Sequence, residues 1–171
     1  KTVSRGTVQA VVINSGNANA WTGAQGVSDA QETAEVAGKA LHTPKGRVFV
    51  SSTGVIGVPM PMARIRAGIR LLADRLGSAT LDDTARAIMT TDTFPKMASK
   101  RIKLGGKLCT ISAISKGAGM IAPNMATMLC YIMTDADVEL KALRAAHGSA
   151  VEQSFNRITI DGDQSTNDTS L

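Results

Sequence analysis

Aromatic residues are scarce in this sequence of 171 residues, where Phe, Trp and Tyr together make up 3%. A buried core must therefore be formed by aliphatic residues, Met and Ala, which allow helices to pack closely against sheets. The hydrophobic content of 43% is ordinary for a globular protein. These proportions favour a single mixed α/β domain over residues 1–171.

Cysteines and long apolar runs are also rare. Cys109 and Cys130 lie in separate apolar runs and form no C-x-x-C pair, which indicates two buried, reduced thiols and no disulfide. No stretch of the sequence is long and apolar enough to span a bilayer, and the first residues lack the pattern of a secretion signal. We therefore expect a cytoplasmic protein that does not insert into membranes.

Positive charge is in excess but is not gathered at one place. The formal net charge is +5, yet Lys and Arg are dispersed and few aromatic rings are available to stack on bases. This distribution argues against nucleic-acid binding. It fits the attraction of small anionic substrates such as carboxylates.

Common cofactor and metal motifs are missing from the sequence. Gly117 and Gly119 lack the third glycine of a dinucleotide-binding fingerprint, and no phosphate-binding P-loop is present. Residues 161–166 begin like a calcium-binding loop but have Thr where glycine is required, so we interpret them as an Asx-rich turn. His42 and His147 stand apart from any Ser or Cys motif and are interpreted as surface residues.

Apolar spacing and turn residues predict a series of strands and helices. Runs rich in β-branched residues predict strands over 8–13, 47–51, 127–134 and 157–160. Helical spacing predicts helices over 28–41, 65–76, 82–89 and 138–155. Ser28 and Gln31 match a capping box at the start of the first helix, and Gly77 is placed to end the second. Gly105-Gly106, between two further strand-like runs, predicts a tight hairpin.

The stretch KGAGMIAPNMATML, residues 116–129, places Gly and Pro before a hydroxyl residue that opens a strand. If the peptide bond before Thr127 is strained, its hydroxyl can attack the carbonyl of Ala126. Cleavage there would leave Thr127 with a free α-amine, an intramolecular general base beside its own hydroxyl. The residues alone also fit an ordinary strand start, and both interpretations remain open at this point.

This stretch resembles the processing site of the ornithine acetyltransferase family, whose members cleave themselves and use a threonine nucleophile. Three further segments are similar to that family in the same order: VVINSGNANAWTG, SSTGVIGVPMP and SFNRITIDGDQSTNDT. Trp21 departs from the family pattern, which has a small residue or Cys there. The resemblance implies an α/β fold of stacked sheets flanked by helices, as in DmpA-like enzymes, and cleavage between Ala126 and Thr127.

The resemblance also implies roles for single residues. Thr127 would be the nucleophile, and Thr53 and Gly54, in a turn after a strand, would form the oxyanion hole. Thr90 and Lys116 would bind the substrate together with Thr127. Without the resemblance, Thr53-Gly54 would be a plain turn and Lys116 an exposed turn lysine.

The implied reaction transfers acetyl from N-acetylornithine to glutamate through an acetyl-threonine, with no metal or organic cofactor. Some family members also accept acetyl-CoA, and the sequence leaves this second donor open. The cleaved protein would be a heterotetramer of two α and two β chains. Family members extend beyond both ends of this sequence, so we expect a fragment of a longer catalytic core. The alternatives are a threonine-nucleophile amidase or aminopeptidase, and a non-catalytic binding domain.

Overall fold

The structure is a computed structural model that describes residues 7–122, 128–163, 165 and 168–171. By its internal contacts the chain divides into two compact units, Lys1–Thr80 and Leu81–Leu171. Two compact units can belong to one domain. The single domain over residues 1–171 therefore stays a prediction.

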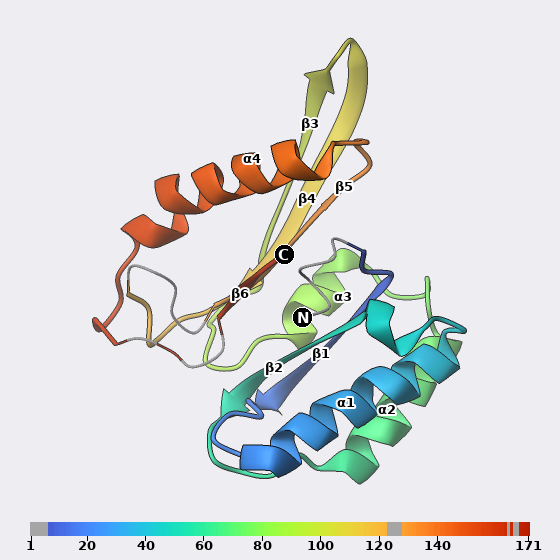
Figure 1. The fold of residues 1–171 in the computed structure, drawn as a ribbon. Coiled ribbons are helices and arrows are strands. Elements are labelled where there is room, and N and C mark those ends of the chain that lie inside the picture. Colours follow the sequence, from blue (N-terminus) through green and yellow to red (C-terminus); the bar gives the residue numbers. More distant parts are fainter. Residues whose placement is uncertain (1–6, 123–127, 164, 166–167) are drawn as a thin grey trace. The chain divides into compact units, whose positions relative to one another are not determined.

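The first unit is a pair of parallel strands covered by two helices (Figure 1). Strand β1, Ala10–Asn17, pairs in parallel with strand β2, Val48–Val55. Parallel neighbours need a crossover connection. Here helix α1, Gly23–Ala40, and a short 3-10 helix, η2, Lys45–Arg47, make that connection, and helix α2, Met62–Asp74, follows β2.

The core of the first unit is aliphatic, as the scarcity of aromatic residues predicts. Its centre is formed by buried Ala37, Val48 and Ile69, from α1, β2 and α2. Partly buried apolar residues pack around this centre: Ala10, Val12, Ala34, Val36, Ala40 and Ile65. Small side chains on α1 allow the helix backbone to lie close to the strands.

Two predictions for the first unit are wrong in detail. Helix α1 begins at Gly23, so Ser28 and Gln31 lie inside the helix and form no capping box. Strand β2 continues to Val55, so Thr53-Gly54 belongs to a strand and not to a turn. For β2 the cause is tertiary, because pairing with β1 extends the ladder through residues whose local preference is a turn. Gly77 does adopt the predicted left-handed conformation, with φ +82°.

The second unit contains a four-stranded sheet in the order β3-β4-β5-β6. The strands are β3 Lys96–Leu104, β4 Lys107–Lys116, β5 Leu129–Thr134 and β6 Thr169–Ser170. All neighbours are antiparallel except β5 and β6. Helix α3, Leu81–Ala87, contacts β3 and β4, and helix α4, Leu140–Gln153, is followed by the 3-10 helix η3, Phe155–Arg157. The described core includes Ala85, Ile88, Ile114, Leu129 and Tyr131.

The hairpin between β3 and β4 has the predicted turn. Gly105 and Gly106 both have positive φ, +55° and +84°. This pair of conformations is that of a type I′ turn, whose twist matches the twist of the flanking strands. The hairpin prediction is therefore confirmed.

The strand predicted over residues 157–160 is not formed as a ladder. The chain closes a 3-10 turn instead, with the N–H of Arg157 donating to Ser154 and the N–H of Ile158 donating to Phe155. Ile160 and Asp161 form isolated bridges with Ile121, and the Thr159 hydroxyl donates to the carbonyl of Ile121 at 3.3 Å. Local hydrogen bonds after α4 thus prevail over the β-branched character of the segment.

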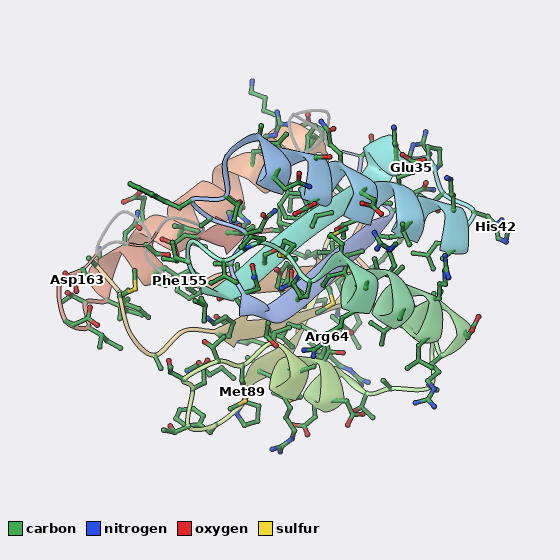
Figure 2. All side chains as sticks on the ribbon, turned by 90° about the horizontal axis from the view of Figure 1, so that it is seen from below. Glu35, His42, Arg64, Met89, Phe155 and Asp163 are labelled. Carbon is green, nitrogen blue, oxygen red and sulfur yellow. The ribbon has the colours of Figure 1, made fainter. Side chains whose placement is uncertain are left out.

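The two cysteines are free, and Cys130 is buried as predicted, whereas Cys109 is only half-buried. His42 is exposed and points outward beyond the end of α1 (Figure 2). His147, on α4, is half-buried. Among the described helices, none has the length and apolar character needed to cross a membrane.

Candidate functional site

The backbone at Thr53 and Gly54 is held very close to the neighbouring strand. Thr53 is 2% exposed, and Gly54 lies opposite Gly16 with φ +132°. A Cβ added at Gly54 would lie 2.3 Å from the carbonyl carbon of Gly16 and 2.6 Å from the nitrogen of Asn17. No side chain fits there, and the register shifts at Asn17, as in a β-bulge.

Asn17 fixes this strand end to the segment that follows β2. Its side-chain amide donates to the carbonyls of Val58 and Pro59 at 3.0 and 3.1 Å. Its Oδ1 accepts from the N–H of Asn19 at 2.9 Å. The hydrogen bonds to Val58 and Pro59 thereby tie the segment after β2 to the end of β1. A fixed backbone is what an oxyanion hole requires, since its donors must not reorganise during the reaction.

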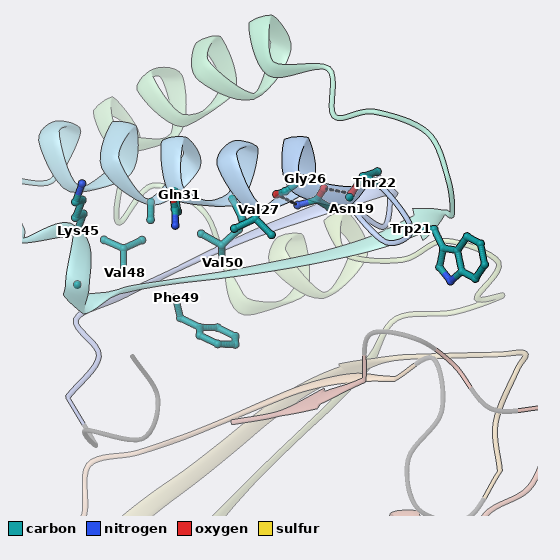
Figure 3. A pocket seen from close by; sticks show the side chains of 14 residues that line it. Asn19, Trp21, Thr22, Gly26, Val27, Gln31, Lys45, Val48, Phe49 and Val50 are labelled. Carbon is teal, nitrogen blue, oxygen red and sulfur yellow. Dashed lines mark hydrogen bonds between the residues drawn. The ribbon is translucent and has the colours of Figure 1, made fainter. Parts of the chain in front are cut away.

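A groove of about 770 Å³ in the first unit lies between α1 and β2 (Figure 3). Val48 and Val50 point toward α1, whereas Phe49 points to the opposite side of β2. At one end Asn19 accepts from the Thr22 hydroxyl at 2.9 Å and donates to the carbonyl of Gly26 at 2.9 Å. Among the described residues that line this groove, Lys45 alone is charged. The size of this groove is therefore no sign of a catalytic site, because one charged side chain gives it little chemical capacity.

In the second unit, the structure brings together two of the predicted substrate-binding residues. The Nζ of Lys116 donates to the hydroxyl of Thr90 at 2.9 Å. Thr90 is exposed in the loop between α3 and β3, and Lys116, the last residue of β4, is 1% exposed. The view of Lys116 as an exposed turn lysine is therefore wrong. The residue ends a strand and lies in the protein interior.

Asp92 lies beside this pair and is itself buried, with its side chain 1% exposed. It accepts from the Lys96 ammonium at 2.5 Å, from the N–H of Gly117 at 2.7 Å and from the N–H of Thr90 at 3.3 Å. Burial acts to raise the pKa of Asp92, but these hydrogen bonds and the charge of Lys96 bring it below the ordinary value. Asp92 is therefore an ionised carboxylate at neutral pH.

Opposing effects act on the pKa of Lys116. Burial lowers the pKa of its ammonium, and the positive charge of Lys96 acts in the same direction. The carboxylates of Asp92 and Asp168 act to raise it, but the pKa stays below its ordinary value. An ammonium in such surroundings interacts strongly with an incoming carboxylate, because little water screens its charge.

A cavity of about 170 Å³ adjoins Lys116 within the second unit. Lys96 and Lys116 line it together with apolar residues that include Ile121, Phe155 and Ile158. Apolar walls with a few charged groups at one edge suit a small amphipathic ligand. This cavity is smaller than the groove beside α1, but its residues fit the predicted carboxylate substrate better.

Ala126 and Thr127, the predicted cleavage junction and nucleophile, lie outside the described residues. The residue after them, Met128, is 8% exposed, and its N–H donates to Oδ1 of Asp168 at 2.7 Å. Burial raises the pKa of Asp168, while the Met128 N–H and the charge of Lys116 act to lower it.

Asp92, Lys96 and Asp168 were not among the predicted site residues. Asp92 lies in the polar loop that begins at Thr90, and Lys96 follows this loop. The sequence could therefore have predicted that Asp92 is close to Thr90. Their link to the end of β4 was not, because it depends on pairing between β3 and β4.

No group of three or more His, Cys, Asp or Glu residues in the described parts of the chain is arranged to hold a metal ion. Asp161 forms the start of the predicted Asx turn instead. Its Oδ1 accepts from the N–H of Asp163 at 3.2 Å, and its Oδ2 accepts from the N–H of Met120 at 2.7 Å.

These features define an α/β protein. In one unit Gly54 closely approaches Gly16 at a strand end, and in the other the buried Lys116 is hydrogen-bonded to the hydroxyl of Thr90. The profile of the ArgJ family matches residues 1–171, and the chain belongs to this family. The resemblance to ornithine acetyltransferases and the α/β fold class are thereby confirmed.

Two curated relatives carry the name arginine biosynthesis bifunctional protein ArgJ. The protein of Geobacter sulfurreducens is 55% identical over 97% of this chain and 42% of its own length. The protein of Symbiobacterium thermophilum is 57% identical over 95% of this chain and 40% of its own length. The chain thus spans about two fifths of the length of these relatives.

Two solved structures are similar to the chain, each with a TM-score of 0.60. The arginine biosynthesis bifunctional protein ArgJ of Bacillus halodurans is 41% identical and shares 68% of this chain and 61% of its own. The ornithine acetyltransferase of Mycobacterium tuberculosis, solved in complex with ornithine, is 34% identical and shares 72% of this chain and 66% of its own.

Proposed function

We propose that the chain is part of an acetyltransferase of arginine biosynthesis that moves acetyl from N-acetylornithine to glutamate. The observation that carries the proposal is the buried Lys116 ammonium hydrogen-bonded to Thr90 in a member of the ArgJ family. Both substrates are amino acids with a free carboxylate, which a buried ammonium and a hydroxyl bind well. That a related acetyltransferase was solved with ornithine supports the same substrate class.

The proposed reaction has two steps. The hydroxyl of Thr127 adds to the acetyl carbonyl, its proton passes to the α-amine of the same residue, and ornithine leaves with a proton on its amine. The amine of glutamate then attacks the acetyl-threonine ester and restores the hydroxyl. Thr53 and Gly54 would stabilise the oxyanion in both steps, and Lys116 and Thr90 would bind the substrate carboxylates.

The second acetyl donor, the assembly and the cellular location that the family resemblance implies belong to the same proposal. The relatives' description as bifunctional supports a second activity, for which acetyl-CoA is the proposed donor. Two α and two β chains, produced by cleavage between Ala126 and Thr127, would form a cytoplasmic heterotetramer.

Intact-mass measurement of the full-length protein tests cleavage and acetylation together. The wild type is expected to be two chains divided between Ala126 and Thr127 and to gain an acetyl group on Thr127 with N-acetylornithine. Thr127→Ala should show neither, and Thr127→Ser should retain part of both, because the nucleophile survives with a less restricted side chain. Thr134→Ala, at the last residue of β5, should behave like wild type.

Following where the acetyl group goes after it leaves Thr127 separates the alternatives. If the acetyl group passes to water as readily as to glutamate, the protein is a threonine-nucleophile amidase. If no acyl group ever appears on Thr127 and the chain stays whole, it is a binding domain and the acetyltransferase proposal is wrong.

A further inference from the structure

Asp92 joins two parts of the second unit that are distant in sequence. Its Oδ1 accepts from the N–H of Gly117, the residue after Lys116, at 2.7 Å, and from the Lys96 ammonium at 2.5 Å. Its Oδ2 accepts from the N–H of Thr90 at 3.3 Å. One carboxylate therefore fixes the backbone at both members of the Thr90–Lys116 pair.

These hydrogen bonds form a closed ring. The ring runs from Asp92 to the backbone of Thr90, through the Thr90 hydroxyl to the Lys116 ammonium, and back along the backbone of Gly117 to Asp92. A displacement of the loop or of the end of β4 would lengthen more than one of these bonds. Such mutual support restricts where the ammonium can lie.

Asp92 also places a negative charge near a buried positive one. Burial opposes the charged form of Lys116, and so does the positive charge of Lys96, while Asp92 and Asp168 favour it. Of the two carboxylates, Asp92 has the larger effect. A neutral amine would lose the charge that binds a carboxylate, so the state of Lys116 determines what it can hold.

We propose that Asp92 is the positioning residue of the Thr90–Lys116 pair, since it orients both groups and supplies the countercharge that the buried ammonium needs to bind a substrate carboxylate. This proposal rests on the substrate-binding role of Lys116 in the proposed function. It adds a residue that acts through Lys116, and it divides the action of Asp92 into a charge effect and a geometric effect.

The charge effect can be measured without any enzymatic activity. In the full-length protein, the rate at which acetic anhydride modifies Lys116 is followed against pH by mass spectrometry of the Lys116 peptide. In Asp92→Asn the midpoint of this titration should move to lower pH, because the countercharge is lost. In Asp82→Asn, which removes the same charge from an exposed ion pair with Arg86 on α3, it should stay at the wild-type value.

Kinetics then report the geometric effect. Asp92→Asn should raise the KM for both N-acetylornithine and glutamate about tenfold with a smaller change in kcat, and move the alkaline limb of kcat/KM to lower pH. Asp92→Glu keeps the charge but shifts the oxygens. It should titrate Lys116 like the wild type and still raise KM.

An unchanged Lys116 titration in a folded Asp92→Asn protein would overturn the proposal, as would a loss confined to kcat. If the wild type transfers no acetyl group, the proposed function fails, and the titration still decides whether Asp92 controls the charge of Lys116. The two failures are thus distinguishable.

Discussion

At the scale of single residues, Lys116 carries charge at a position that is almost closed to water. Burying an ammonium costs several kcal/mol unless partners offset the loss of hydration. Here the Thr90 hydroxyl and the carboxylates of Asp92 and Asp168 are those partners. Such an arrangement leaves the positive charge in place for an anionic substrate.

Lys116→Met should therefore weaken the binding of both amino-acid substrates. Methionine keeps most of the aliphatic length but has no charge and no donor for a carboxylate, so we expect the KM values to rise by about tenfold or more. Lys100→Met, at an exposed position of β3, should leave both values unchanged. Unaltered Michaelis constants in the Lys116 variant would remove this residue from the site.

Thr53→Ala should keep the fold and depress acetyl transfer by about two orders of magnitude, the usual effect of losing one oxyanion donor. The reduction should appear in kcat rather than in KM, because the donor acts on the transition state. Thr53→Ser retains the hydroxyl and should recover part of the rate. Equal turnover by a folded Thr53→Ala protein would show that this threonine only packs in β2.

Asp92 should make the free energy of unfolding decrease as the pH falls in the acidic range. Its pKa is lower in the folded protein than its ordinary value, about 3.9 in an unfolded chain, so its contribution is fully present above that value. The contribution is lost as the pH falls through the lower, folded-state pKa. The free energy of unfolding, measured in urea at a series of pH values, should therefore fall less steeply in Asp92→Asn than in Asp82→Asn.

At the scale of elements, the parallel pair β1–β2 depends on a close approach of two glycines. Gly54→Ala should destabilise the protein by more than about 2 kcal/mol, because the new methyl group meets the backbone of Gly16 and the residue must keep a positive φ. Gly46→Ala, where the added carbon meets nothing within 4 Å, is the matched control. Thermal unfolding should show a clear fall in Tm for the first and little change for the second.

Local signals predicted the elements better than their ends. The glycines of the β3–β4 hairpin require positive φ, which is a property of the turn itself. The end of β2 was missed because the pairing of β1 with β2 draws turn-forming residues into a strand. The start of α1 was also missed, since the helix begins at Gly23, before the predicted cap. The segment 157–160 was taken for a strand since its composition is β-like, although the chain there closes a 3-10 turn.

At the scale of the whole molecule, the chain corresponds to about two fifths of its relatives, 42% and 40% in the two examples above. We expect the 171-residue chain alone to transfer acetyl far more slowly than a full-length relative. Holding the donor and nucleophile in attack geometry can supply roughly 7–11 kcal/mol, and much of this is lost when part of a pocket is missing. Equal rates of transfer to glutamate, measured side by side, would contradict this expectation.

The sequence by itself determined the family, the helices, the hairpin and the aliphatic character of the core. These depend on contiguous motifs, on the spacing of apolar residues and on composition, all of which are written along the chain. Only the tertiary structure decided that Lys116 is buried against Thr90, that Gly54 lies against Gly16 and that Asp92 connects a loop to the end of β4. Burial and charge pairing arise between residues far apart in sequence, and their energies are set by the surroundings that folding creates.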